Sequence, residues 1–301
     1  MKKKIIVIQG PTASGKTALG VELAKYYDTV VVSSDSRQFY KEMSIGTAKP
    51  SKEEMSNIPH FFIDSHSINQ ELTAASYEKE ALTKLTELFK EKDVVLLVGG
   101  SGMYIDALCE GLDDIPASKE IKKQLNKELK ENGLQVLLSE LKQKDLEYYE
   151  TVDKSNPMRV IRALEAIRFS GKTYSSFRNK KKIERSFKVV RFVINHERTV
   201  LYDRINQRVD QMINDGLVDE VKSLERYREL AVMKTVGYSE FFDFFDNKLT
   251  LDEAIEKVKQ NTRRYAKRQL TWFRRKESAV WLKYTDIEGM KKEVIAVISA
   301  L

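Results

Sequence analysis

The chain contains few of the residues that mark secreted, membrane-embedded or disordered proteins. Its 301 residues include one cysteine, Cys109, together with five prolines and 13 glycines. One cysteine excludes an internal disulfide and a zinc site built from several cysteines, and the low proline and glycine content argues against long disordered segments. No apolar run approaches the ~20 residues of a membrane span. These absences predict a globular, cytoplasmic protein with no membrane partner.

The start of the chain and its charge carry weaker signals. MKKKIIVIQG begins like a signal peptide, but its apolar part runs only from Ile5 to Ile8 and no cleavage site follows, so we interpret it as a first strand. The net charge of +7 hints at a polyanionic partner. Seven Lys or Arg and no acid fall in RRYAKRQLTWFRRK, from Arg263 to Lys276. A solvated helix face is the alternative interpretation of this run.

Short β-branched runs alternate with helical patterns in the first hundred residues. The expected strands are Lys4–Gln9, Thr29–Ser33, Val94–Val98, Val189–Ile194 and, more weakly, Val280–Tyr284; the expected early helices are Thr17–Tyr26 and Ser76–Lys90. Most of these runs are continuously apolar, as in strands buried on both faces. The order strand, glycine-rich turn, helix, strand predicts an α/β fold with a P-loop NTPase-like parallel sheet flanked by helices.

The middle of the chain has a different composition and hydrophobic pattern. Charge-rich helical sequence without strand character follows Gly111, and strand character returns only at VVRFVI. We therefore predict a mostly helical insertion domain at residues 115–186. Residues 1–114 and 187–301 would form the α/β core with a helical C-terminal region.

One motif identifies a phosphate-binding loop. GPTASGKT matches G-x-x-x-x-G-K-T between a predicted strand and a predicted helix. The glycines allow backbone N–H groups to surround an anion, and the helix adds its positive end. The predicted diphosphate-binding residues are Gly10, Pro11, Thr12, Ala13, Ser14, Gly15, Lys16 and Thr17, with Thr17 also offering a hydroxyl to Mg²⁺. The motif indicates a di- or triphosphate but not the reaction.

Two further segments end predicted strands. Asp35 stands where α/β sheets place their chemistry, and it could act as a general base, hold Mg²⁺ or cap a turn. The next strand ends in Gly99-Gly100-Ser101, where a nucleotide kinase would often carry an acid; the first acid beyond it is Asp106. His60, His66 and His196 have no metal-ligand spacing and are interpreted as turn or core residues.

Taken together, the motifs resemble one family. GPTASGKT, DSRQFY, IGTAKP, PHFFID, GGSGMYI, NPMRVIRALEAI, MINDGLVDEV, TVGYSE and YAKRQLTWFR follow the order of the bacterial tRNA dimethylallyltransferases, also called tRNA isopentenyltransferases. The resemblance covers nearly the whole chain. It implies transfer of a dimethylallyl group from dimethylallyl diphosphate to the N6 amine of the adenosine 3′ to the anticodon, with diphosphate as the leaving group.

The resemblance also implies roles for individual residues. Asp35 would be the general base, Thr12 would contact the donor, Lys16 and Arg208 would bind its diphosphate, and Mg²⁺ would be the cofactor. The implied tRNA contacts are Asp35, Ser36, Arg37, Gln38, Ser101, Lys122, Arg159, Val160, Ile161, Arg162, Ala163, Arg264, Lys267, Arg268 and Gln269. We expect a monomer whose insertion domain holds the anticodon stem-loop.

Three positions depart from the family pattern. Ser101 stands where Thr is common, Phe61 replaces a second histidine after His60, and Lys122 stands near an expected Arg. Two other functions remain open on the residues alone. The first is a P-loop kinase of a small metabolite, and the second is a non-catalytic RNA-binding protein with a nucleotide switch.

Overall fold

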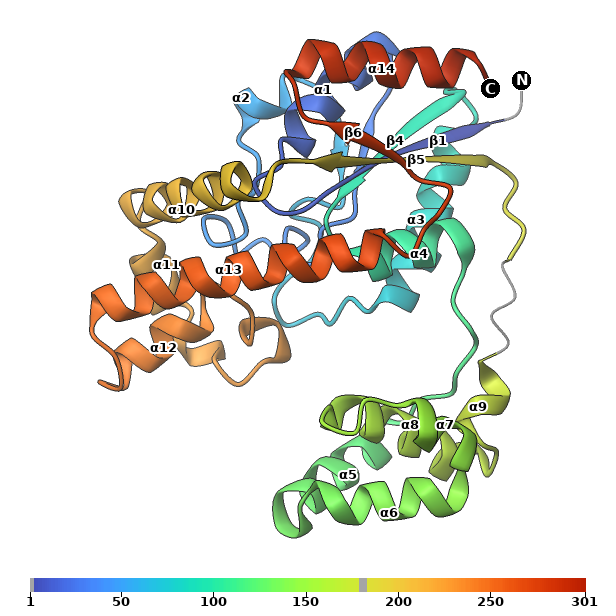
Figure 1. Ribbon diagram of the computed structural model, residues 1–301, viewed down its shortest axis with the longest axis vertical. Coiled ribbons are helices and arrows are strands. Elements are labelled where there is room, and N and C mark those ends of the chain that lie inside the picture. The colour runs from blue at the N-terminus through green and yellow to red at the C-terminus, as the bar shows by residue number, and fades with distance from the viewer. Residues whose placement is uncertain (1–2, 179–182) are drawn as a thin grey trace. The chain divides into compact units, whose positions relative to one another are not determined.

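The protein is seen in a computed structural model that describes residues 3–178 and 183–301. It divides into two compact units (Figure 1). The first combines Met1–Glu110 with Arg185–Leu301, and the second is Gly111–Glu184. The sequence-based boundaries were 115 and 186, so the second unit begins earlier, at Gly111, whose φ of 85° suits glycine.

The first unit is built on one parallel sheet in the order β3-β2-β4-β1-β5-β6. Its strands are β1 (Lys4–Gln9), β2 (Val31–Ser33), β3 (His60–Phe61), β4 (Val94–Gly99), β5 (Lys188–Asn195) and β6 (Val280–Lys283). The predicted strand at Thr29 begins two residues later in the structure. The two-residue strand β3 was missed because it is too short to show a periodic pattern.

Helices cover both faces of this sheet. The helices of the first unit are α1 (Lys16–Tyr26), α2 (Lys52–Met55), α3 (Ala74–Leu88), α4 (Gly102–Glu110), α10 (Arg198–Asn214), α11 (Leu217–Ser223), η1 (Glu225–Tyr227), η2 (Ala231–Met233), α12 (Ser239–Phe245), α13 (Leu251–Phe273) and α14 (Ile287–Ser299). Alternate residues of β1 serve opposite faces: Ile6 and Ile8 pack with α1 and α14, whereas Ile5 and Val7 pack with α3 and α4. Burial on both faces explains the continuous apolar run.

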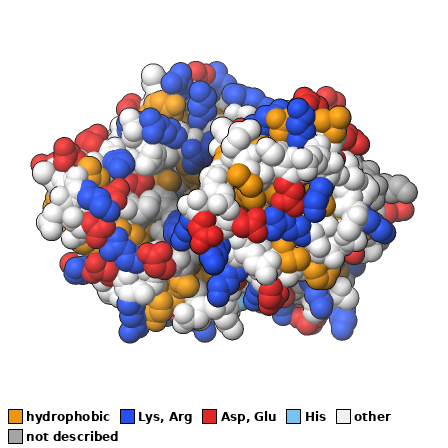
Figure 2. Space-filling view, turned by 90° about the horizontal axis from the view of Figure 1, so that it is seen from below, with side chains coloured by type: hydrophobic (Ala, Val, Ile, Leu, Met, Phe, Trp, Pro, Cys, Tyr) orange, Lys and Arg blue, Asp and Glu red, His pale blue; other side chains and the backbone are white. Residues whose placement is uncertain are grey.

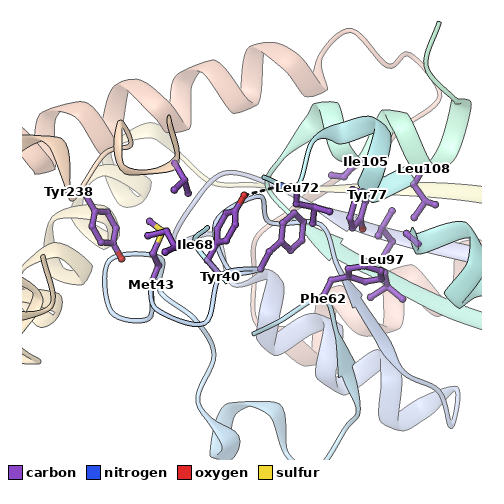
Figure 3. Close-up of a cluster of buried hydrophobic side chains, with 14 of the residues drawn as sticks. Tyr40, Met43, Phe62, Ile68, Leu72, Tyr77, Leu97, Ile105, Leu108 and Tyr238 are labelled. Atoms are coloured by element: carbon purple, nitrogen blue, oxygen red, sulfur yellow. Dashed lines mark hydrogen bonds between the residues drawn. The ribbon is translucent and has the colours of Figure 1, made fainter. Parts of the chain in front are cut away.

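The larger core cluster extends from the sheet to the loops that bear the site. Figure 3 shows Tyr40, Met43, Phe62, Tyr77 and Tyr238 within it. The Tyr40 hydroxyl accepts a hydrogen bond from the backbone N–H of Leu72 (3.3 Å). The loops between residues 34 and 72 are therefore anchored by large buried side chains, each worth about 1.5–3 kcal/mol when fully buried.

The second unit is an all-helical bundle. It comprises α5 (Lys119–Asn132), α6 (Leu134–Lys144), α7 (Leu146–Thr151), α8 (Pro157–Ser170) and α9 (Tyr174–Phe177). Its own core gathers around α8, whose Val160, Ile161 and Leu164 are at most 1% exposed. Asn156 caps α8 by accepting from the N–H of Arg159, and Pro157 occupies its first turn, which together define where the helix starts.

Candidate functional site

The loop after β1 has the backbone shape of an anion cradle. Gly15 has a φ of 91° and Ala13 a φ of 62°, a costly conformation for a residue with a side chain. At Gly10, an added Cβ would lie 2.8 Å from the Ser14 hydroxyl oxygen and 3.2 Å from the Ile194 carbonyl oxygen. Lys16 then opens α1, so the loop and the positive end of the helix converge.

Side chains from distant segments hold this loop in place. Arg204 donates from Nε to the Ala13 carbonyl (2.8 Å), and His196 donates from Nε2 to the Ser14 carbonyl (2.9 Å). Burial lowers the pKa of His196, which keeps the ring neutral and suited to this role. Neither contact could be predicted from sequence, because the end of β5 and α10 are brought to the loop only by the fold.

Gln269 links the P-loop to the end of β4. Its Oε1 accepts from the backbone N–H of Thr12 (3.0 Å), and its Nε2 donates to the Gly100 carbonyl (2.8 Å). The residue is 6% exposed. Gln269 is thus a buried bridge between two site loops on the inner face of α13, and because it also lines the cavity described below, its contact with tRNA stays a prediction.

The pKa of Lys16 is far below its ordinary value. Its ammonium donates to the Pro11 carbonyl (2.7 Å). Burial lowers its pKa from 10.5 to about 8; the Asp35 carboxylate opposes this shift and the Arg208 cation adds to it. The three charged groups thus influence one another, as expected of side chains that act on one ligand.

The loop after β2 presents Asp35 to the same space. Asp35 Oδ1 accepts from the backbone N–H of Arg37 (3.0 Å), a turn that fixes the carboxylate. Ser101 accepts from the N–H of Ser36 at 2.9 Å and donates to its hydroxyl at 3.0 Å. Burial and the nearby Asp35 carboxylate raise the pKa of Tyr265 to about 12, so its hydroxyl keeps its proton.

Lys16, Asp35 and Tyr265 line one cavity of about 250 Å³ in the first unit. Thr12, Lys16, Thr17, Asp35 and Arg208 form a polar part of its lining. Apolar side chains of α10, the segment 235–237 and α13 form another part; they are Ile205, Val209, Met212, Val236 and Val258. The apolar wall was missed from sequence, although the α10 residues show helical spacing, because the same spacing is typical of an ordinary core face.

A third part of the lining comes from residues 35–38 and 46–48. Ser36, Arg37, Gln38, Gly46, Thr47 and Ala48 line the cavity along with Gln269 and Tyr265. Gln38 donates from Nε2 to the carbonyls of Thr47 (3.2 Å) and Ala48 (3.0 Å). The DSRQFY and IGTAKP motifs thus meet in one wall.

The basic segment of α13 divides into two faces. Arg264, Lys267 and Arg268 are exposed, at the three- and four-residue spacing of one helix face. The opposite side carries the buried Ala266, Gln269 and Phe273. Trp272 donates to Asp106 (2.9 Å), and Lys276, beyond the end of α13, pairs with Glu110 (2.7 Å). Figure 2 shows Lys and Arg mixed with Asp and Glu on the surface it views, so the positive charge is not gathered into one large patch there.

In the second unit, some of the residues predicted to contact tRNA lie in the core of the helical bundle. The side chains of Val160, Ile161 and Ala163 are buried in the bundle, and the predicted contact of this segment with tRNA stays a prediction. Arg162 donates to the carbonyls of Ile115 and Pro116 and to Glu165. Lys122 and Arg159 are exposed, and their contact with tRNA stays a prediction.

Oxygen donors are available for a magnesium ion. In the described parts of the chain, 3–178 and 183–301, no group of three or more His, Cys, Asp or Glu could hold a metal. The Thr17 hydroxyl and the Asp35 carboxylate nevertheless both line the cavity. Mg²⁺ commonly takes one or two protein oxygens and completes its shell with phosphates and water, so this donor set fits it.

Fold and site together define a P-loop α/β enzyme with a mixed polar and apolar substrate cavity. The family model described as IPP transferase matches residues 38–276. tRNA dimethylallyltransferase 1 of Bacteroides fragilis is 46% identical over 299 residues, 99% of this chain and 98% of that protein. The tRNA dimethylallyltransferase of Flavobacterium psychrophilum is 48% identical over 298 residues, 97% of each chain.

Solved structures agree. The full-length tRNA isopentenylpyrophosphate transferase of Bacillus halodurans superposes with a TM-score of 0.74 at 38% identity, covering 99% of this chain and 96% of that one. A eukaryotic dimethylallyltransferase described as acting on tRNA gives 0.79 at 27% identity, covering 95% of this chain and 75% of that one. The chain belongs to the IPP transferase family. The predicted resemblance, fold class and enzyme class are thereby confirmed.

No helix within residues 3–178 and 183–301 has the length and apolar character needed to cross a bilayer.

Proposed function

We propose that this enzyme transfers a dimethylallyl group from dimethylallyl diphosphate to the N6 amine of the adenosine 3′ to the anticodon of tRNA. One observation carries the proposal: a single cavity joins the P-loop Lys16, the Asp35 carboxylate and an apolar wall. The P-loop suits a diphosphate, the Asp35 carboxylate suits an attacking amine, and the apolar wall suits a five-carbon chain.

The P-loop would stabilise the departing diphosphate. Breaking the allylic C–O bond places negative charge on the bridging oxygen, where backbone N–H groups and the Lys16 and Arg208 cations would stabilise it. Mg²⁺ held by Thr17, with Asp35 within the same cavity, would supply further neutralisation of the diphosphate. Gln269 and Arg204 would contribute by keeping the loop in its binding shape.

Asp35 would accept the proton from the attacking amine. Its carboxylate is fixed by the N–H of Arg37, and Tyr265 stands nearby with its proton retained. An adenine amine is a poor nucleophile, so its orientation toward the allylic carbon contributes at least as much as proton removal. The base must leave the anticodon-loop stack to enter the cavity.

The exposed face of α13 and the second unit would bind the RNA backbone. Arg264, Lys267 and Arg268 offer cations at helical spacing, and Lys122 and Arg159 are exposed in the bundle. Their contacts would supply salt-dependent affinity. A monomer acting in the cytoplasm is part of the proposal.

The donor distinguishes this proposal from a metabolite kinase. The purified protein is incubated with Mg²⁺ and either dimethylallyl diphosphate or ATP, with and without tRNA transcribed in vitro, and released diphosphate or ADP is measured. Diphosphate released only when dimethylallyl diphosphate and tRNA are both present supports the transferase. ADP produced without tRNA would instead support the kinase.

A further inference from the structure

Glu220, on α11, makes an unusual set of hydrogen bonds to a loop far from it in sequence. Its Oε2 accepts from the backbone N–H groups of Ser44 (2.9 Å) and Ile45 (2.8 Å), and its Oε1 accepts from that of Gly46 (3.0 Å). A carboxylate that receives three backbone N–H groups forms charge-assisted bonds, which are stronger than neutral ones. We call residues 44–48 the clamped loop.

Tyr238 completes the clamp. Its hydroxyl donates to Glu220 Oε1 (2.7 Å), and its ring is fully buried beside the loop, near Met43 (Figure 3). A Cβ on Gly46 would lie 2.5 Å from a Tyr238 ring carbon, so only glycine permits this approach. Burial and the Glu220 charge raise the pKa of Tyr238 and keep it a donor.

The clamped loop is held in a strained shape. Ala48 has a φ of 48°, a left-handed conformation that persists in a residue with a side chain only when its surroundings enforce it. Thr47 adds an internal bond from its hydroxyl to the Met43 carbonyl (2.9 Å). The result is that the carbonyls of Thr47 and Ala48 both face the Gln38 amide.

This arrangement fixes which atom of Gln38 remains available. Only the NH₂ end of an amide can donate to two carbonyls, so both Nε2 hydrogens are committed to Thr47 and Ala48. The remaining atom, Oε1, accepts and cannot donate. Gln38 lines the cavity. A side-chain hydrogen bond from Gln38 to a base bound there would therefore use Oε1, which is an acceptor.

We infer that Glu220 and Tyr238 are positioning residues that set base specificity through the clamped loop and Gln38. An acceptor-only Gln38 favours a base whose edge presents an exocyclic amine. It disfavours one that presents a carbonyl at the same position, because two facing acceptors leave a buried group unpaired. The inference rests on the proposed function, since it assumes that a purine enters this cavity.

The test measures binding of RNA rather than turnover. Anticodon stem-loops carry either adenine or hypoxanthine at the target position, and their affinities for the full-length protein are compared in the presence of inorganic diphosphate and Mg²⁺. The wild type is expected to prefer adenine about tenfold, the cost of one unmade buried hydrogen bond. Glu220→Gln should reduce this preference to about twofold or less, because an amide at this position presents N–H to an N–H donor.

Three further variants separate positioning from folding. Asp219→Asn removes a charge from the same turn of α11 and should keep the full preference, since Asp219 is exposed. Tyr238→Phe removes one bond and leaves three, so a partial loss is expected. In a Gln38→Ala background, Glu220→Gln should change the preference no further, because the atom through which it acts is gone.

Equal preferences in the wild type and in folded Glu220→Gln and Tyr238→Phe would overturn the inference. So would an additive effect of Glu220→Gln in the Gln38→Ala background. Absence of prenyl transfer by the wild type is a separate result, which would refute the proposed function itself.

Discussion

Replacing Lys16 by Met should make the protein more stable while removing its ability to bind diphosphate. The pKa of Lys16 falls from 10.5 to about 8 on folding. At about 1.4 kcal/mol for each tenfold change in proton affinity, the folded protein loses up to ~3.5 kcal/mol by keeping this lysine charged. Part of the side chain is exposed, and its bond to Pro11 is lost in the variant, so we expect a net gain of about 1–2 kcal/mol at pH 7.

The pH dependence of the free energy of unfolding tests the direction of this effect. Between pH 8 and 10.5 the unfolded chain holds the Lys16 proton and the folded chain does not, so the stability of the wild type rises with pH across this window. Below pH 8 the penalty is present in full. The advantage of Lys16→Met should therefore be constant below pH 8 and shrink as the pH approaches 10.5.

Urea unfolding at several pH values measures this difference. Lys25→Met is the matched control, because Lys25 is exposed on the same helix and pairs with Glu22. Calorimetry with inorganic diphosphate and Mg²⁺ tests the predicted loss of diphosphate binding. The affinity of the wild type for diphosphate should fall above pH 8, and Lys16→Met should bind diphosphate weakly at every pH. A variant less stable than the wild type at pH 7, or a stability difference that does not change with pH, would show that folding does not lower the pKa of Lys16.

Three other changes test other parts of the site. Asp35→Asn should lower turnover about 10²–10⁴-fold, the range for a lost general base, with tRNA affinity retained in a filter-binding assay; unchanged turnover would remove Asp35 from the reaction. Arg268→Ala should weaken tRNA binding and reduce the slope of log affinity against log salt by about 1, whereas an unaltered slope would place Arg268 outside the interface. Gln269→Leu, which fills the same space without the two bonds, should raise the KM for the donor more than it lowers kcat, and a normal KM would show that the P-loop needs no such support.

Local features were predictable where chemistry and pattern coincide. The run before Gly10 predicted β1 because a strand buried on both faces is continuously apolar, and the GPTASGKT motif fixed the position of the anion-binding loop. Asp35 was placed by its position at the end of β2. These inferences need only the chain on either side of the residue.

Contacts between distant segments were not predictable in this way. Gln269 reads as one polar residue in a basic helix, yet it is buried and joins Thr12 to Gly100. Val160 and Ile161 lie between two arginines, and their burial follows from how α8 faces its bundle. Glu220 lies in the MINDGLVDEV motif, but its contacts with the backbone of residues 44–46 could not be foreseen because those partners are about 175 positions away in the chain.

The proposed transfer is tested most directly by finding which nucleoside of the tRNA receives a labelled dimethylallyl group. Wild type and Asp35→Ala are incubated with Mg²⁺, radiolabelled dimethylallyl diphosphate and unmodified tRNA, and the tRNA is digested to nucleosides. With the wild type, label is expected on the N6 amine of the adenosine 3′ to the anticodon, and with Asp35→Ala the label should be reduced at least about a hundredfold. Label at another nucleoside, or equal label with both proteins, would contradict this expectation.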